Sequence, residues 1–272
     1  MSTPGGARLR ALRETAGRTQ LWVEAEAELG TGYLQRLESG RVAQPERGTL
    51  ERILNALEAR YGERKEILER FGYLVPTPPP TDEEIAWARA ICRRELDELP
   101  FPALALDCTH RLIAWNRLLP RLLGVGPDDP LVRGLARGCF LTHWLDPVSA
   151  LAGLVAEPDV FLPAMIRAFR YEMEKVGNEP WAIELLSELR RFPRFVHYAA
   201  MADRAPATAS AARVLVPLRL AVPDAGLLEF RVAAEPFTRD PRFRLVSYLP
   251  TDPFTMRRCA AWTAESPSDA LG

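Results

Sequence analysis

Between residues 17 and 45, polar side chains occur at spacings that suit contact with double-stranded DNA. Gln35 and Arg36 stand between two apolar positions, Leu34 and Leu37. If both leucines are buried, the opposite face of this segment can enter a major groove. There arginine can bond to guanine O6 and N7 in a bidentate manner, and glutamine to adenine N6 and N7. The residues expected to contact DNA are Gln20, Thr31, Gly32, Gln35, Arg36 and Arg41.

Two short helices are expected to position these side chains. Thr19 is a candidate N-cap for a helix over residues 20–27, and a second helix is expected over residues 30–38. The free backbone N–H groups at the start of the first helix would meet a DNA phosphate, and Gln20 adds a side-chain donor there. Arg41 follows the second helix, where it can contact the DNA backbone. Together these features predict a helix-turn-helix unit.

Three glutamates complicate this interpretation. Glu24, Glu26 and Glu28 lie in or just after the first of the two helices, close to the expected DNA face. Negative charges at that place would repel phosphates. They leave open a second interpretation, in which the helical segment has lost DNA binding and belongs to a protein-interaction or lipid-carrier module.

Helical periodicity extends over the whole N-terminal segment. Leu9 and Leu12 predict a first helix that ends at Gly17, Thr49 is expected to cap a fourth, and a fifth is expected around residues 67–71. Five short helices in a segment of this length predict a compact, all-α head. The expected core residues are Val23, Ala27, Leu29, Leu34, Leu37, Ile53 and Leu57.

A proline-rich stretch separates this head from the rest of the chain. Residues 75–80 have the sequence VPTPPP, and four prolines in five positions can neither continue a helix nor pair as a central strand. They favour a stiff, extended polyproline conformation. We therefore expect a DNA-binding domain over residues 1–75, a linker over 76–81 and a second domain over 82–272.

The second domain mixes helices and strands. A helix over residues 81–99 is expected to turn Ile85, Ala88, Ile91 and Leu99 inward. The later elements are expected to be strands over 102–106 and 111–115, a short helix over 116–123, a helical region over 131–198, and strands over 214–222, 227–233 and 243–249. This order predicts an α+β domain with a five-stranded antiparallel sheet and helices on one face.

Composition limits the alternatives. The chain has 272 residues, with 35 Lys+Arg against 36 Asp+Glu and a formal net charge of -1. The first 75 residues carry 12 basic and 11 acidic side chains, so charge does not decide whether DNA is a partner. No stretch approaches the ~20 apolar residues of a membrane-spanning helix. Residues 1–10 show no secretory signal, so a cytoplasmic protein is expected.

Catalytic and metal-binding patterns are weak. Cys92, Cys108, Cys139 and Cys259 have no CxxC spacing, and the three histidines form no i, i+4 pair. We therefore expect no metal site and four reduced cysteines in the core. No nucleophile-elbow, zinc-protease or P-loop motif is present, and a polar trio around His143 is the one group that suggests an active site. Neither an enzyme nor a resident cofactor is expected.

Residues 8–72 resemble the Xre/Cro-repressor-like helix-turn-helix domain. The resemblance rests on TQ at residues 19–20 and on YLQRLESGR at residues 33–41. Three positions depart from the family's pattern: Glu28 stands where the turn usually has a glycine, Glu24 where a small residue is usual, and Trp22 where a polar residue is common. The binding mode of such heads implies a homodimer, in which the two protomers read operator half-sites about 34 Å apart.

Residues 8–258 together resemble the MmyB-like regulators. The matching stretches of the second domain are AWN at residues 114–116, RGCF at 137–140 ahead of Asp146 and Pro147, residues 188–195, and LVSYLP at 245–250. The resemblance implies a PAS-like ligand-binding domain that holds an apolar small molecule, such as a fatty acid or a similar acyl chain.

The second domain has enough apolar bulk for such a ligand. The expected pocket residues are Trp115, Phe140, Trp144, Phe161, Met165, Phe169, Trp181 and Phe195, with Arg137 as the partner of a carboxylate head group. The alternatives are that the aromatic residues are ordinary core and that Arg137 lies on the surface or caps a helix. Asn116 is expected to cap the helix after it.

The resulting hypothesis is a two-domain, ligand-responsive transcriptional regulator that binds operator DNA as a homodimer. Its all-α five-helix helix-turn-helix head would be joined to an α+β PAS-like domain with a five-stranded antiparallel sheet. The competing hypothesis is a lipid-binding or protein-interaction module with a degenerate helix-turn-helix that does not bind DNA. An enzyme acting on an acyl substrate would need a nucleophile that the sequence does not supply.

Overall fold

The computed structural model describes residues 3–126, 129–204 and 215–265. The chain divides into two compact units, one of Met1–Pro76 with Thr238–Pro241 and the other of Thr77–Phe237 with Arg242–Gly272. We call the first unit the head and the second the sheet unit.

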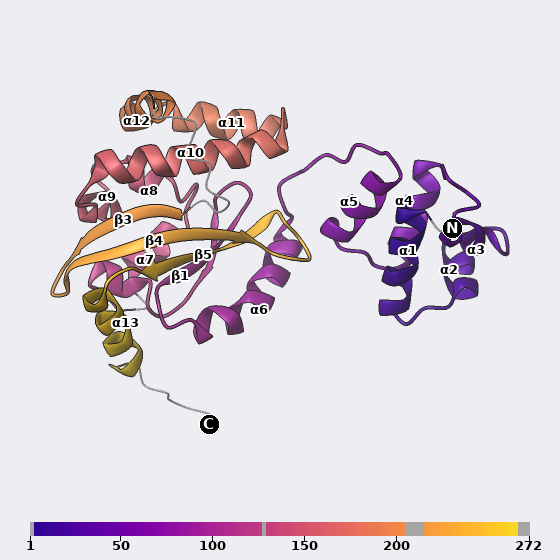
Figure 1. Ribbon diagram of the computed structural model, residues 1–272, viewed down its shortest axis with the longest axis horizontal. Helices are drawn as coiled ribbons and strands as arrows, with labels where there is room; N and C mark the ends of the chain where they lie inside the picture. The colour runs from indigo at the N-terminus through magenta and orange to yellow at the C-terminus, as the bar shows by residue number, and fades with distance from the viewer. Residues whose placement is uncertain (1–2, 127–128, 205–214, 266–272) are drawn as a thin grey trace. The chain divides into compact units, whose positions relative to one another are not determined.

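The described residues of the head contain the helices that the periodicity predicts. They are α1 (Pro4–Thr15), α2 (Gln20–Glu26), α3 (Tyr33–Glu38), α4 (Arg47–Ala56) and α5 (Tyr61–Arg70) (Figure 1). Their apolar faces meet in one core. Of the expected core residues, Leu29 is half-buried and the others are buried.

Two helix starts differ from the predictions. α3 begins at Tyr33 rather than near residue 30, because Gly32 has a φ of 76°, which a right-handed helix does not contain. α4 begins at Arg47 with Glu46 as its N-cap. Thr49 therefore does not cap α4 but lies buried inside it.

The turn between α1 and α2 agrees with the prediction. Gly17 follows α1 with a φ of 66°, a conformation that glycine adopts without strain. The Thr19 side chain then accepts a hydrogen bond from the Trp22 N–H at 3.1 Å and so caps α2.

A buried ion pair joins α1 to α3. Arg13 donates from Nε and Nη2 to the two carboxylate oxygens of Glu38, at 2.7 and 3.0 Å. Gln20 on α2 donates to the same carboxylate at 2.7 Å. Gly6 lets α1 approach α3, since a Cβ there would lie 2.5 Å from the Leu37 carbonyl oxygen. Because bidentate, charge-assisted bonds are directional, this network sets the orientation of the three helices.

A second buried carboxylate, that of Glu24, caps α3 from α2. Gly32 at the N-cap has no side chain that can accept the free N–H groups of the first turn. Glu24 accepts from the Gly32 N–H at 3.0 Å and from the Leu34 N–H at 2.8 Å, and it is 4% exposed. The fold therefore uses a carboxylate that the sequence suggested was close to DNA.

The sheet unit alternates a few strands with many helices. It begins with α6 (Asp82–Glu98), β1 (Ala103–Asp107) and β2 (Leu112–Trp115). The middle consists of a 3-10 turn, η1 (Pro120–Leu123), and of α7 (Pro130–Leu135), α8 (Thr142–Leu145), α9 (Ala150–Leu154), α10 (Pro158–Val176), α11 (Pro180–Leu189) and α12 (Pro193–Arg204). The last described elements are β3 (Leu215–Val222), β4 (Gly226–Pro236), β5 (Phe243–Pro250) and α13 (Pro253–Glu265).

The strands form the five-stranded antiparallel sheet that the sequence predicts, in the order β2-β1-β5-β4-β3. Helices cover both faces rather than one: α10, α11 and α12 lie on one side and α6 on the other (Figure 1). We call the side of α10 the inner face. Leu104, Val246 and Tyr248 belong to the large apolar core on that face. Ala105 and Phe243 pack with α6 in a smaller core.

Three details of the sheet unit differ from the predictions. Ile91 of α6 is 46% exposed, and Cys92 and Leu96 are buried in its place, because a step of four residues stays on the face of Ala88. The segment expected as a helix over 116–123 is regular only in η1. Of the strand expected over 214–222, position 214 lies outside the described residues.

We expect Glu24→Ala to loosen α3 without removing apolar contacts. The N–H groups of Gly32 and Leu34 would lose their acceptor, which costs about 1–2 kcal/mol. Hydrogen–deuterium exchange of the full chain should then accelerate over α3 by roughly tenfold. Glu26→Ala, at an exposed position of the same helix, is the control and should change this exchange little. Equal acceleration by both substitutions would show that Glu24 is not the cap.

Candidate functional site

Helix α3 has one buried and one exposed face. Leu34 and Leu37 are at most 1% exposed, and they pack into the core of the head. Arg36 lies over the Tyr33 ring at 5.8 Å, a cation–π contact that holds its guanidinium at the surface. Of the predicted DNA contacts, the exposed ones are Thr31, Gln35, Arg36 and Arg41, and Gly32 is half-buried at the N-cap.

Gln20 differs from the other predicted contacts because its amide is bound inside the head. Its Nε2 donates to Glu38 at 2.7 Å, and the residue is half-buried. A primary amide has a second N–H, so Gln20 keeps one donor besides this bond. Its structural role links the start of α2 to the end of α3.

The three glutamates of the α2 region have different environments. Glu24 is buried under α3 by its hydrogen bonds to the backbone. Glu26 and Glu28 are exposed. Glu28 has a φ of 53°, so it adopts the left-handed conformation that glycine adopts without strain. Two exposed carboxylates therefore remain near α3, rather than three.

The predicted pocket residues are mostly brought together in the sheet unit. Six of them are buried in the inner-face core: Phe140, Trp144, Phe161, Met165, Phe169 and Phe195. Edge-to-face pairs connect several of the rings, with centroid distances of 5.1 Å for Trp144 and Phe161 and 6.4 Å for Phe169 and Phe195. The core of the sheet unit is therefore rich in aromatic side chains, as the sequence predicts.

Three other predicted pocket residues lie at or beyond the edge of this core. Trp115 and Trp181 are half-buried and pack against it. The Trp181 indole donates to the Thr77 carbonyl oxygen at 2.6 Å, which holds that ring at the border. Arg137 is exposed, in the turn after α7.

Asn116 does not cap a helix as the sequence predicts, because η1 has Leu119 as its N-cap and no side-chain cap; Asn116 binds the turn before η1 instead. Its Oδ1 accepts from the N–H groups of Leu118 and Leu119, both at 3.2 Å. The same oxygen accepts from Ala103 at 3.1 Å, and Nδ2 donates to the Phe101 carbonyl at 2.7 Å. The side chain therefore ties β1 to the segment after β2.

A charged cluster of His110, Glu172 and Arg244, which the sequence analysis does not include, lies in the inner-face core. Glu172 of α10 forms an ion pair with Arg244 of β5. Its Oε2 also lies 3.3 Å from His110 Nε2, without hydrogen-bond geometry. Strand alternation could have predicted that Arg244 is buried. Residues 244, 246 and 248 of β5 share one face, and Val246 and Tyr248 belong to the inner-face core.

The cluster is placed in an unfavourable environment for charge. Burial lowers the pKa of His110 well below its ordinary value of 6.5, and the nearby Arg244 lowers it further. His110 is therefore neutral near pH 7. Burial also lowers the pKa of Arg244 to about 10, so the guanidinium stays protonated at neutral pH.

The turn between β1 and β2 holds His110 in place. Asp107 is fully buried and accepts from Thr109 Oγ1 at 2.6 Å and from the Arg111 N–H at 3.0 Å. His110 itself has a φ of 60°, and its carbonyl oxygen accepts from the Phe140 N–H at 2.7 Å. This bond connects the turn to the aromatic core.

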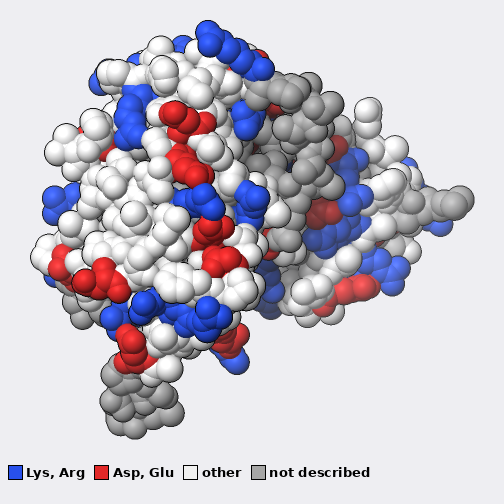
Figure 2. All heavy atoms as spheres, turned by 60° about the vertical axis from the view of Figure 1, so that its left-hand side comes forward, with Lys and Arg blue, Asp and Glu red and all other residues white. Residues whose placement is uncertain are grey.

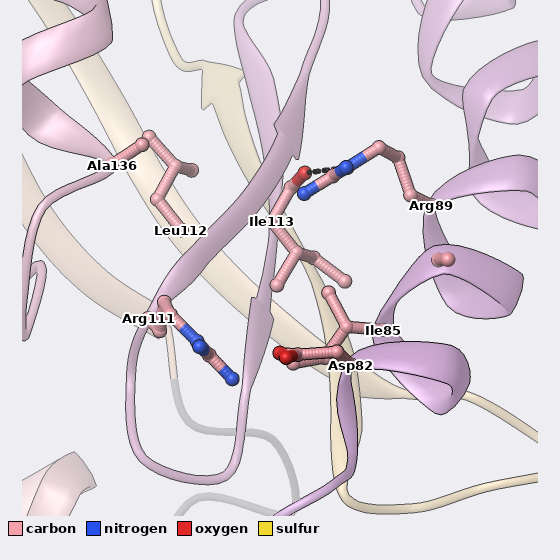
Figure 3. A pocket seen from close by; sticks show the side chains of 8 residues that line it. Asp82, Ile85, Arg89, Arg111, Leu112, Ile113 and Ala136 are labelled. Carbon is pink, nitrogen blue, oxygen red and sulfur yellow. Dashed lines mark hydrogen bonds between the residues drawn. The ribbon is translucent and has the colours of Figure 1, made fainter.

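An open cleft of ≈ 320 Å³ lies on the other side of the sheet, between α6 and β2. Arg111 and Asp82 point toward one another across it, and Arg89 donates to the Ile113 carbonyl oxygen at 2.9 Å (Figure 3). Its side chains carry both signs of charge, and Arg111 is bonded to Asp107 at 3.1 Å. The cleft does not include any of the predicted pocket residues.

Burial disfavours the thiolate at three of the described cysteines. Burial raises the pKa of the Cys92, Cys139 and Cys259 thiols to about 11, so they are protonated and unreactive at neutral pH. No group of three or more His, Cys, Asp or Glu side chains with metal-binding geometry occurs in the part of the chain that the structure describes. Asp146 accepts from the Val148 N–H, a local turn contact beside His143.

Two surface properties complete the description. None of the described helices has both the length and the apolar character to cross a membrane. On the face shown in Figure 2, acidic and basic side chains are interspersed.

Comparison with known proteins identifies both units. A family model described as a helix-turn-helix domain matches residues 6–67, and one described as the MmyB-like transcription regulator ligand binding domain matches residues 88–261. No curated protein matches the chain.

One solved structure, titled "Structure of an RNA-binding Light-Oxygen-Voltage Receptor", aligns at 15% identity with a TM-score of 0.27. The alignment covers 97% of this chain, which spans 63% of the length of that receptor. A similarity at this level supports no conclusion about fold or function. The family match, by contrast, covers well over half of the chain, with a helix-turn-helix domain before it. The chain therefore belongs to the MmyB-like transcription regulators, whose two domains are those of a ligand-regulated transcription regulator.

Proposed function

We propose that the chain binds operator DNA through α3 and that an apolar molecule with an acyl chain, bound in the sheet unit, regulates this binding. The observation that supports DNA binding is the orientation of α3. Its leucines are buried, its N-terminus and its C-terminal Glu38 are held by buried carboxylate contacts, and Gln35 and Arg36 are exposed on the remaining face. A helix held rigidly with bidentate donors outward suits base recognition.

The proposed contacts divide by chemistry. Gln35 and Arg36 would read base edges, with Thr31 and Gly32 at the start of the helix close to the same groove. Gln20 and Arg41 would contact phosphates, which position the head but do not read sequence. One such head covers a single half-site, so we propose that the regulator acts as a homodimer.

The proposed ligand follows from the core of the sheet unit. The six buried residues of the expected pocket belong to one apolar core of rings and a methionine thioether, side chains that suit contact with an alkyl chain. A fatty acid is the simplest molecule of this class. Binding would shift the population of dimer geometries and so the distance between the two α3 helices.

One observation favours a second function. Glu26 and Glu28 are exposed near the proposed DNA contacts, and the first 75 residues carry nearly equal numbers of basic and acidic side chains. A head of this kind that had lost DNA binding would leave a lipid-binding or protein-interaction module. The two functions differ in one property, which is retention on DNA that falls steeply with salt.

Arg36→Ala is expected to weaken binding to a DNA site selected with the wild-type chain by about 1–3 kcal/mol. The loss should be much smaller on DNA of unrelated sequence, because Arg36 would contact bases rather than phosphates. Fluorescence anisotropy with both DNAs measures the difference. Arg10→Ala, at an exposed position of α1, is the matched control and should leave both affinities unchanged.

The outcome that contradicts this proposal is equally clear. If the wild-type chain selects no site and shows no salt-dependent retention on DNA, the proposed DNA binding is wrong and the second function is favoured. If Arg36→Ala binds the selected site as tightly as wild type, α3 does not read bases through Arg36.

Dodecanoate is expected to raise the melting temperature of the full chain and to appear as an added mass under native mass spectrometry. The physical reason is mass action, because a ligand that binds the folded state alone stabilises it. Butyrate, which has the same head group but too little apolar area, is the control and should do neither. A protein that purifies without added mass and shows no shift with dodecanoate does not bind an acyl ligand.

A further inference from the structure

Arg244 lies at a position of the sheet where its neighbours are apolar. It pairs with Leu106 across β5 and β1, and residues directly opposite in an antiparallel pair share a face. Leu106 belongs to the inner-face core, as does Val246, two residues after Arg244 on the same strand. The guanidinium therefore projects from the middle strand toward α10, where its side chain is 10% exposed.

The polar atoms of the charged cluster are poorly hydrogen-bonded. Among the described residues, the guanidinium of Arg244 has Glu172 as its ion-pair partner, and Glu172 Oε2 makes no hydrogen bond of good geometry there. His110 is 4% exposed, and neither of its ring nitrogens has a hydrogen-bond partner in that part of the chain. Asp107, the next carboxylate, is already bound to Thr109 and Arg111. Buried polar atoms without partners are costly, so the cluster can gain from a carboxylate that bonds to Arg244 and His110 with better geometry than Glu172 does.

Glu172 is the member of the cluster that can leave it. Its side chain is 25% exposed, compared with 6% for His110 and 10% for Arg244. It also comes from a different element, α10, whereas Arg244 and His110 are held by the sheet and by the turn between β1 and β2. A carboxylate from solvent can therefore reach the place that Glu172 occupies.

The apolar core begins beside the cluster. Phe169, almost one turn before Glu172 on α10, contacts the His110 ring edge-to-face with centroids 5.1 Å apart. Phe169 in turn lies 6.4 Å from Phe195. An alkyl chain attached to a carboxylate at the cluster would therefore enter the proposed ligand-binding core directly.

We propose that Arg244 and His110 form the head-group site for a carboxylate on the acyl ligand, and that Glu172 occupies this site when no ligand is bound. This inference rests on the proposed function, because it needs the ligand to lie in the inner-face core. The exchange replaces one carboxylate by another, so the buried charge does not change. Arg244 would bind the head group in a bidentate manner, and His110 would donate one N–H.

The exchange would also change the contact between α10 and the sheet. The Glu172–Arg244 ion pair is a direct bond between α10 and the middle strand. A ligand carboxylate that takes the place of Glu172 removes this bond and releases α10, which packs against α12 and β3. Ligand binding would thus change how tightly α10 is bound to the sheet.

The test compares dodecanoate with dodecanol, which has the same chain without the charge, by isothermal titration of the full chain and its variants. Glu172→Gln removes the charge of the internal competitor, so dodecanoate affinity should rise by roughly tenfold while dodecanol affinity stays constant. The double variant Arg244→Leu with Glu172→Leu removes the ion pair without leaving a buried charge. It should bind dodecanoate no better than dodecanol.

Arg137→Leu is the matched control, since Arg137 is the exposed arginine that the sequence suggested as the head-group partner. It should keep the wild-type preference for dodecanoate. His110→Asn, which tolerates a positive φ, should reduce the preference by a smaller factor than the double variant. Melting temperatures establish that each variant is folded. If the double variant does not fold, Glu172→Gln still decides, because its expected effect is a gain.

The failures are distinguishable. Wild-type protein that binds neither probe contradicts the proposed acyl ligand, and the head-group site with it. Wild-type protein that binds dodecanol as tightly as dodecanoate contradicts the head-group site alone. A preference for dodecanoate that disappears in Arg137→Leu and persists in the double variant places the head group at Arg137 and overturns the assignment to Arg244.

Discussion

Helix α3 cannot stabilise itself, and the arrangement of the head depends on how other helices hold it. It has 6 residues, too few for stability in isolation, and it follows a glycine that offers no side-chain cap. Glu24 of α2 supplies the cap at one end, and Arg13 of α1 binds Glu38 at the other. Both carboxylates are buried, so moving the helix would expose or unpair a charge. Gln35 and Arg36 are therefore presented on a rigid surface.

The two units bury ion pairs that differ in completeness. In the head, both oxygens of Glu38 accept from Arg13, and Gln20 adds a further donor. In the sheet unit, Arg244 and Glu172 make an ion pair without such a network. A fully bonded pair fixes a geometry, whereas a poorly bonded pair beside an apolar core can exchange partners. This contrast fits a rigid DNA-binding head joined to a domain that responds to a ligand.

Much of the fold could be predicted from local patterns. Apolar periodicity located the helices of the head, and alternation between turns located the five strands. The errors concern ends and faces. Thr49 has the chemistry of a cap but lies inside α4, and Ile91 has the chemistry of a core residue but is exposed. The start of α4 and the buried face of α6 depend on the segments that pack against these helices, and the pattern of one segment constrains them only in part.

The sequence by itself determined the helix-turn-helix pattern, the aromatic content of the core and the family, because these follow from residue types at short spacings. Only the tertiary structure decided what the charged residues do. It places Glu24 under α3, although its neighbours Glu26 and Glu28 are exposed, and it buries Arg244 while Arg137 remains at the surface. The physical reason is that the environment of a charge depends on burial and on partners from distant segments. Arg244 meets Glu172 only after the sheet and α10 have packed together.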